Sequence, residues 1–275
     1  MTLAVGFFDG VHLGHQRILA GADAVLTFRN HPLSVVNPSC APPLLMDVSE
    51  RIALLGTAGA KNPRAVHAVR FTKKFAAMRP EEFAGYLRRE FPDLEKVHCG
   101  GNWRFGAGGA GVPQTLRDFG FSVKVARYAM YGGAAISSTR IRSALAEGDV
   151  ALANAMLGRR FAVSGRVVRG KGVGGSIGSP TLNLEVSPPL RLGVYAVDTR
   201  YGRGVANYGF APTMGADSWQ RPVLEVHLLD FVDGKAIPAR EKIRVEFAKF
   251  IRPERKFPSI KALRRQVAAD IVGSW

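Results

Sequence analysis

Cysteine is scarce in this sequence, which has only Cys40 and Cys99 among its 275 residues. The two lie far apart, and neither has a histidine or another cysteine at the spacing of metal ligands. The sequence therefore indicates neither a disulfide framework nor a zinc site. We expect two ordinary reduced thiols.

Long apolar runs are also missing, since no stretch reaches the roughly 18 residues that a membrane helix requires. The apolar run Leu3–Val5 follows almost directly after Met1, which leaves no room for a basic and apolar leader with a cleavage site. With 47% hydrophobic and 22% charged residues, the composition is that of a globular protein. We expect a cytoplasmic protein with no membrane partner.

The net charge of +16 is not gathered in any block of like charges. Both halves of the chain share the excess of lysine and arginine, whereas a nucleic-acid surface usually clusters it. A diffuse positive field suits an enzyme with anionic substrates, because it raises their local concentration, and ATP fits it as well as RNA does. We expect a monomer or weak oligomer with no specific nucleic-acid partner.

The first half of the chain alternates short β-branched runs with helical patterns. Strands are predicted at residues 3–5, 24–28, 66–71, 96–99 and 122–128, and helices from about residue 14 and at 49–57, 80–91 and 139–146. This alternation predicts an α/β domain with a parallel sheet. Ligands of such sheets bind beyond the carboxyl ends of the strands, where the loops Phe7–His15 and Gly100–Gly111 are expected.

The pattern changes after Gly158, so we expect two domains, 1–158 and 159–275. Short alternating runs at 162–168, 193–199, 223–230 and 242–247 are separated by glycine and proline, which predicts an antiparallel barrel or sandwich. A last apolar pattern from Ile260 to Ile271 has helical spacing and predicts a packing helix that closes the domain.

The run from Gly6 to His15 carries the first chemistry-bearing motif, His12-x-Gly14-His15. Two imidazoles around a glycine at the start of a helix let a phosphate approach the backbone while both rings donate hydrogen bonds to its oxygens. We therefore predict that His12 and His15 are catalytic. The alternative is a pair of incidental histidines after a turn. The other residues of the run that we assign to ATP binding are Gly6, Phe7, Asp9 and Gly14.

A second motif, Ile136 to Arg142, precedes another predicted helix. Its hydroxyls would cap a helix in any protein, so the motif alone is weak. Together the two motifs resemble the HxGH and ISSTxxR signatures of the nucleotidylyltransferase superfamily. That resemblance implies that Ser137, Ser138, Thr139 and Arg142 hold the ATP phosphates that leave as pyrophosphate.

Further motifs narrow the resemblance to one family. They are Thr27–Pro32, Phe71-Thr72, Gly101–Gly106, Gly165–Val168, Gly178–Asn183, Gly193–Ala196 and Glu225–Phe231. In this order the chain resembles the bacterial bifunctional riboflavin kinase/FAD synthetase family. The resemblance implies a Rossmann-like nucleotidylyltransferase domain and a flavokinase β-barrel. It also implies ATP-dependent phosphorylation of riboflavin to FMN and adenylylation of FMN to FAD.

The second half offers its own candidates for phosphoryl transfer. The glycine-rich stretch around Gly172 and Gly178 can wrap the phosphates of ATP, although such stretches are as often plain turns. Thr181 and Asn183 offer oxygens suited to Mg²⁺ bound with ATP, a role that the resemblance assigns to them. Glu225, an acid on an apolar strand, would be the family's general base, or else lies on the solvent side.

The resemblance also implies flavin contacts at His31, Asn102 and Phe105, although His31 before a proline could be structural and Phe105 could belong to the core. Phe7 departs from the family, which usually has asparagine there. Two alternatives stay open: an enzyme with one degenerate half, and a non-catalytic flavin- or RNA-binding protein.

Overall fold

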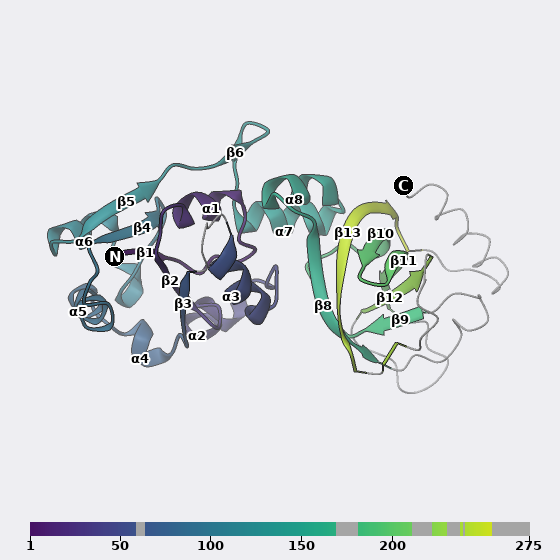
Figure 1. Ribbon diagram of the computed structural model, residues 1–275, viewed down its shortest axis with the longest axis horizontal. Helices are drawn as coiled ribbons and strands as arrows, with labels where there is room; N and C mark the ends of the chain where they lie inside the picture. The colour runs from purple at the N-terminus through teal and green to yellow at the C-terminus, as the bar shows by residue number, and fades with distance from the viewer. Residues whose placement is uncertain (59–63, 169–180, 211–221, 230–236, 239, 255–275) are drawn as a thin grey trace. The chain divides into compact units, whose positions relative to one another are not determined.

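Residues 1–58, 64–168, 181–210, 222–229, 237–238 and 240–254 are described by the computed structural model (Figure 1). The chain divides into two units, Met1–Ser138 and Thr139–Trp275. By this division the residues from Thr139 to Gly158 group with the second unit, and the sequence-based boundary at residue 158 stays a prediction.

The first unit is built on a five-stranded parallel sheet with the order β3-β2-β1-β4-β5, which confirms the predicted α/β fold. The strands are β1 (Thr2–Val5), β2 (Ala24–Phe28), β3 (Ala65–Val69), β4 (Lys96–Gly100) and β5 (Ser122–Ala126). The strand order reverses between β1 and β4. The loops that follow these two strands therefore lie at the switch point where such sheets bind ligands.

Helices cover both faces of this sheet. They are α1 (Leu13–Leu19), α2 (Leu33–Val36), α3 (Val48–Thr57), α4 (Lys73–Ala76), α5 (Pro80–Glu90) and α6 (Pro113–Asp118). Alternate residues of β1 face opposite sides: Leu3 and Val5 pack in the core cluster that contains α5, while Ala4 packs with Leu19 and Leu55. A two-stranded hairpin, β6 (Met130–Tyr131) and β7 (Ala134–Ala135), completes the unit.

The second unit contains a closed antiparallel barrel with the order β10-β11-β12-β9-β8-β13, so the barrel is confirmed over the sandwich. The strands are β8 (Phe161–Val168), β9 (Thr181–Leu184), β10 (Gly193–Thr199), β11 (Gly202–Gly209), β12 (Val223–Leu228) and β13 (Lys242–Arg252). The helices α7 (Ser138–Glu147) and α8 (Val150–Leu157) precede it. The predicted closing helix lies outside the described residues.

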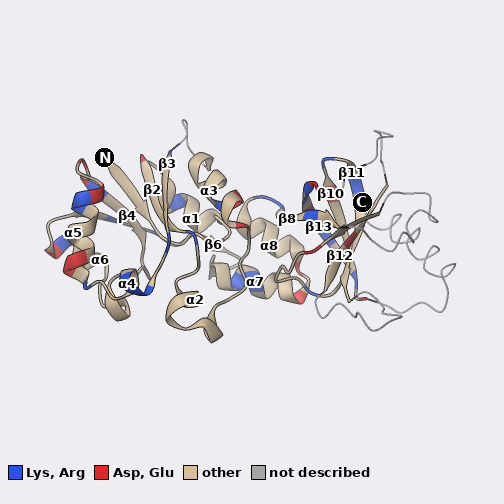
Figure 2. Cartoon of the chain, turned by 90° about the horizontal axis from the view of Figure 1, so that it is seen from below, with Lys and Arg blue, Asp and Glu red and all other residues tan. Residues whose placement is uncertain are grey.

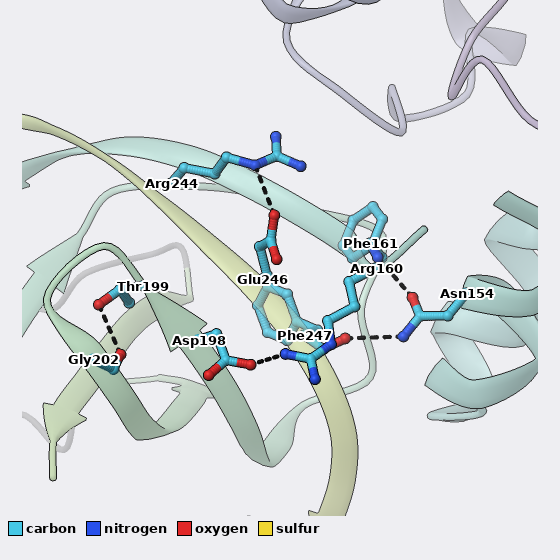
Figure 3. A network of polar contacts seen from close by, with 9 residues as sticks. All are labelled: Asn154, Arg160, Phe161, Asp198, Thr199, Gly202, Arg244, Glu246 and Phe247. Atoms are coloured by element: carbon cyan, nitrogen blue, oxygen red, sulfur yellow. Dashed lines mark hydrogen bonds and ion pairs between the residues drawn. The ribbon is translucent and has the colours of Figure 1, made fainter. Parts of the chain in front are cut away.

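Asn154 ties α8 to the barrel (Figure 3). Its Nδ2 donates to the carbonyl of Phe247 on β13 at 3.0 Å, and its Oδ1 accepts from the backbone N–H of Phe161 on β8 at 2.6 Å. Nearby, Arg160 forms an ion pair with Asp198 on β10. One side-chain amide thus joins a helix to two barrel strands.

Charged residues of both signs occur in both units, as the even distribution along the sequence predicts (Figure 2). Cys40 is exposed and Cys99 is buried, and both are free thiols. Within the described part of the chain, no helix is long and apolar enough to cross a membrane.

Candidate functional site

The two motif histidines lie against each other at the start of α1. His12 is the N-cap residue, and its Nδ1 accepts a hydrogen bond from the backbone N–H of His15 at 3.2 Å. The two rings are stacked, with centroids 3.5 Å apart and an interplanar angle of 18°. Because Nδ1 of His12 is an acceptor, the proton of its neutral ring is on Nε2, where it can be donated to a ligand.

The loop between β1 and α1 has a strained backbone that the sequence did not reveal. Phe8, Gly10 and Val11 have φ angles of 57°, 81° and 41°, a left-handed region that Val and Phe rarely adopt. Thr27 on β2 holds this loop, since its hydroxyl donates to the carbonyl of Phe7 at 3.1 Å. Strain of this kind persists where the surrounding structure fixes it, and it is concentrated at functional sites.

Asp9 and Ser138 link the two motifs. The Asp9 side chain is 2% exposed, and both of its carboxylate oxygens accept from the backbone N–H of Leu45 at 3.1 Å. Ser138 donates its hydroxyl to the Asp9 carbonyl at 2.8 Å. The Asp9 carboxylate thus supports the loop, while its predicted contact with ATP stays a prediction. Ser137 is exposed beside this bond.

The residues predicted to bind flavin lie in different environments. The Nδ1 of His31 accepts from the N–H of Leu33 at 3.1 Å, and its ring meets the Phe7 ring edge-on at 4.6 Å. Asn102 is exposed in the loop after β4. Phe105 is only 6% exposed and stacks on Trp103 within the core, which favours a packing role.

A hollow of about 780 Å³ lies where β2 and β3 end. The amide of Asn30 joins the two loops, since it donates to the Phe71 carbonyl and accepts from the Phe71 N–H, both at 3.0 Å. The lining residues are Arg29, Asn30, Ser34, Val35, Arg70, Phe71, Thr72 and Lys73. Three of them are cations, which suits an anionic ligand. No sequence pattern groups these cations, because they follow two separate strands.

The kinase candidates of the second unit meet on one face of β9 and β12. Asn183 pairs with Glu225, and Thr181 pairs with His227. Side chains alternate along a strand, and the neighbours of these residues point into the barrel core. The core residues are Leu182, Leu184, Leu224, Val226 and Leu228. The antiparallel register thus places Thr181, Asn183 and Glu225 on one face of the barrel, while their chemical roles stay predictions.

Two further polar residues join this face. The hydroxyl of Thr181 lies 3.0 Å from Nδ1 of His227, and Asn207 on β11 pairs with Glu225. Burial lowers the pKa of His227, whereas burial and the charge of Glu254 raise the pKa of Glu225. His227 could have been found in the sequence, because it lies two residues after Glu225 on the same strand and side chains two residues apart share a face. Asn207 lies in a glycine-rich run that did not indicate a strand.

Not every predicted residue can be placed in a site. Gly172 and Gly178 lie outside the described residues. Thr139 and Arg142 follow Ser138 on α7, in the second unit.

Residues 1–140 match the family described as FAD synthetase, and residues 157–273 match the family described as riboflavin kinase. The chain is 36% identical to a bifunctional riboflavin kinase/FMN adenylyltransferase of Escherichia coli (strain K12), covering 98% of this chain and 90% of that protein. The chain belongs to the bifunctional riboflavin kinase/FMN adenylyltransferase family. It carries both enzyme domains of that family, so riboflavin, FMN and ATP are its small-molecule substrates.

Other members of the bifunctional riboflavin kinase/FMN adenylyltransferase family are similar over the same length. The Bacillus subtilis (strain 168) protein of this name is 33% identical, with 98% of this chain and 90% of the relative covered. A crystal structure described as a macrolide-efflux protein from Streptococcus pneumoniae is 26% identical, with a TM-score of 0.82 over 99% of this chain and 93% of that one. The predicted family, fold class and paired activities are therefore confirmed.

Proposed function

We propose that the strained loop and α1 of the first unit are where AMP is transferred from ATP to FMN. His12 and His15 would donate hydrogen bonds to phosphate oxygens whose negative charge grows during the reaction. Donors of this kind contribute about 3–4 kcal/mol each to transition-state stabilisation. The observation that supports this role is the stacked pair, with ring centroids 3.5 Å apart and held by the His12 cap.

The remaining ATP contacts in this proposal come from both motifs. Gly6, Phe7 and Gly14 would contact ATP beside the histidines. Ser137, Ser138, Thr139 and Arg142 bind the phosphates that leave as pyrophosphate. The bond from Ser138 to the Asp9 carbonyl supports this arrangement, because it joins the second motif to the first.

FMN would bind near His31, with its phosphate beside the cations of the hollow where β2 and β3 end. Arg29, Arg70 and Lys73 supply three positive charges there, and guanidinium groups pair well with phosphate oxygens. Asn102 would bind the flavin or adenine from the loop after β4.

In the second unit, we propose that Glu225 accepts the proton of the riboflavin 5′-hydroxyl while that oxygen attacks the γ-phosphate of ATP. The bond between the γ-phosphorus and the bridging oxygen breaks, and ADP leaves. Thr181 and Asn183, which lie on the same face, would hold Mg²⁺ together with the ATP phosphates. A hydroxyl and an amide oxygen are hard donors that fit this ion, which usually keeps phosphate and water ligands as well. When bound, Mg²⁺ would neutralise negative charge on the phosphates.

The direct test is to incubate the purified chain with riboflavin, ATP and Mg²⁺ and to separate the flavins. FMN and FAD are both expected. If riboflavin and supplied FMN both stay unchanged, the proposal is wrong. If only one product forms, one half is degenerate.

Two variants separate the sites. Glu225→Gln is expected to abolish FMN formation and to spare the conversion of FMN to FAD, while His15→Ala is expected to do the reverse. Glu246→Gln on β13 is a matched control that removes a half-exposed carboxylate and should spare both steps. Equal loss of both steps from either site variant would contradict two independent sites.

We further propose that the chain works in the cytoplasm as a monomer or weak oligomer and does not bind nucleic acid specifically. The absence of a basic block in the sequence supports the last point. Light scattering gives the oligomeric state. RNA binding with a steep dependence on salt concentration would contradict the expectation.

A further inference from the structure

Arg51 is completely buried, at 0% exposure, although arginines on the surface helices of globular proteins are mostly exposed. It lies on α3, and its Nη2 donates to the carbonyl of Phe28. Its guanidinium carbon lies 4.0 Å from the centroid of the Phe7 ring. Phe28 ends β2 and Phe7 follows β1, so one side chain contacts the carboxyl ends of two neighbouring strands.

Packing alone does not account for this burial. Within the described part of the chain, Nε and Nη1 of Arg51 are buried without a hydrogen-bond partner. Burial lowers the pKa of Arg51 to about 10, although Asp9 and Asp47 oppose the shift, so the group stays charged at neutral pH. An incompletely paired charge in a protein interior is destabilising, and proteins retain such groups mainly at functional sites.

Phe7 transmits the contact to His31. Its ring contacts both the Arg51 guanidinium and the His31 ring, whose centroid is 4.6 Å away at an interplanar angle of 75°. Its carbonyl is fixed by the hydroxyl of Thr27 at 3.1 Å. The loop that contains Phe7 continues to His12, while the loop that follows Phe28 continues to His31.

We propose that Arg51 is a positioning residue for adenylyl transfer. Its guanidinium fixes the Phe7 ring against His31 and holds the Phe28 carbonyl, so that the loop with His12 and the loop with His31 keep a constant spacing. The catalytic consequence rests on the proposed function, whereas the contact is a property of the fold. It also gives a reason for the aromatic residue at position 7, since a cation over a desolvated aromatic ring is stabilising.

The test compares Arg51→Lys, which keeps the charge but not the planar group, with Arg51→Met. Both are expected to slow FMN-to-FAD conversion by about 10–100-fold, the usual loss when a supporting contact is removed. Riboflavin phosphorylation by the same protein should not change. The chain has six histidines, few enough to resolve their ring ¹H–¹⁵N signals by NMR, and the signal of His31 should shift when the Phe7 ring moves.

Arg64 provides the matched control. It is also buried, at 8% exposure, but its Nε and Nη1 donate to the carbonyls of Ala22 and Leu55 at 3.1 and 3.0 Å. Ala22 precedes β2, and Arg64 precedes β3, so this arginine lies at the amino ends of the strands, away from the motifs. Arg64→Lys and Arg64→Met should leave the His31 signal and FAD formation by the folded protein unchanged.

A folded Arg51→Met protein that makes FAD at the normal rate, with the His31 signal in place, overturns the proposal. If Arg51→Met does not fold, Phe7→Leu is tested in its place. A His31 signal that stays at its wild-type position in Phe7→Leu also overturns the proposal. A wild-type protein that makes no FAD contradicts the proposed function instead. The positions of the His31 signal in the wild type and in the Arg51 variants then test whether Arg51 fixes the Phe7 ring against His31.

Discussion

Replacing Gly14 with alanine should impair adenylyl transfer by displacing one histidine. A Cβ at this position would lie 3.0 Å from Cε1 and 3.1 Å from Nδ1 of His12, so the ring must move by a few tenths of an ångström. That movement disturbs both the 3.2 Å bond from the His15 N–H and the 3.5 Å stacking of the rings. The backbone itself is helical at Gly14 and accepts alanine without strain.

The expected size of the effect follows from this displacement. A misplacement of about 1 Å in a reacting group costs about 100-fold in rate, so a shift of a few tenths should cost on the order of 10-fold. Such a loss corresponds to a barrier raised by about 1.4 kcal/mol. Weakening the His12 cap should also lower the free energy of unfolding by about 1 kcal/mol.

The assay measures kcat for FMN-to-FAD conversion, with riboflavin phosphorylation by the same protein as internal reference. Gly85→Ala on α5 is the control, because a Cβ there meets nothing within 4 Å. It should stabilise the protein by about 0.5–1 kcal/mol and leave FAD formation unchanged. A Gly14→Ala protein that makes FAD as fast as Gly85→Ala would refute the steric reasoning.

Two further predictions concern stability. Asn154→Ala leaves the N–H of Phe161 and the carbonyl of Phe247 without their partner. At about 1–3 kcal/mol for each group, the free energy of unfolding should fall by about 2–6 kcal/mol, and an unchanged melting temperature would rule this out. Burial lowers the pKa of His98, and the nearby lysines lower it further. As pH falls below about 6.5, the ordinary pKa of histidine, the unfolded chain therefore binds a proton at this position before the folded chain does. The free energy of unfolding should fall in this range. His98→Asn should show a smaller fall between pH 7 and pH 5, and an identical fall in both proteins would contradict this assignment.

Strand bounds could be read from the sequence where apolar β-branched residues alternate or cluster. The predictions for 24–28 and 193–199 coincide with β2 and β10. The strand β11 was missed because Gly202, Gly204 and Gly209 interrupt its pattern, and glycine is unfavourable in strands. The structure explains one of them, since a Cβ at Gly204 would lie 2.7 Å from the carbonyl oxygen of His227.

The candidate sites also differ in how far local sequence spacing predicts them. His12 and His15 are three residues apart at a helix start, so their contact could be predicted from spacing alone. Arg51 could not be predicted, because its partners Phe7 and Phe28 are distant in sequence and a single arginine in a helix normally indicates an exposed face. Tertiary packing alone brings these three residues together.

If Thr181 and Asn183 act as proposed, phosphoryl transfer depends on the correct pairing of β9 with β12. A slip of one residue in β9 would turn Thr181 and Asn183 into the apolar interior and expose Leu182 and Leu184 to water. The misaligned barrel would lose stability and its polar face in the same step. Selection that preserves the leucine core therefore also preserves the alignment of the polar face. A chain with a shifted strand would be less stable and would therefore be degraded by proteases more readily.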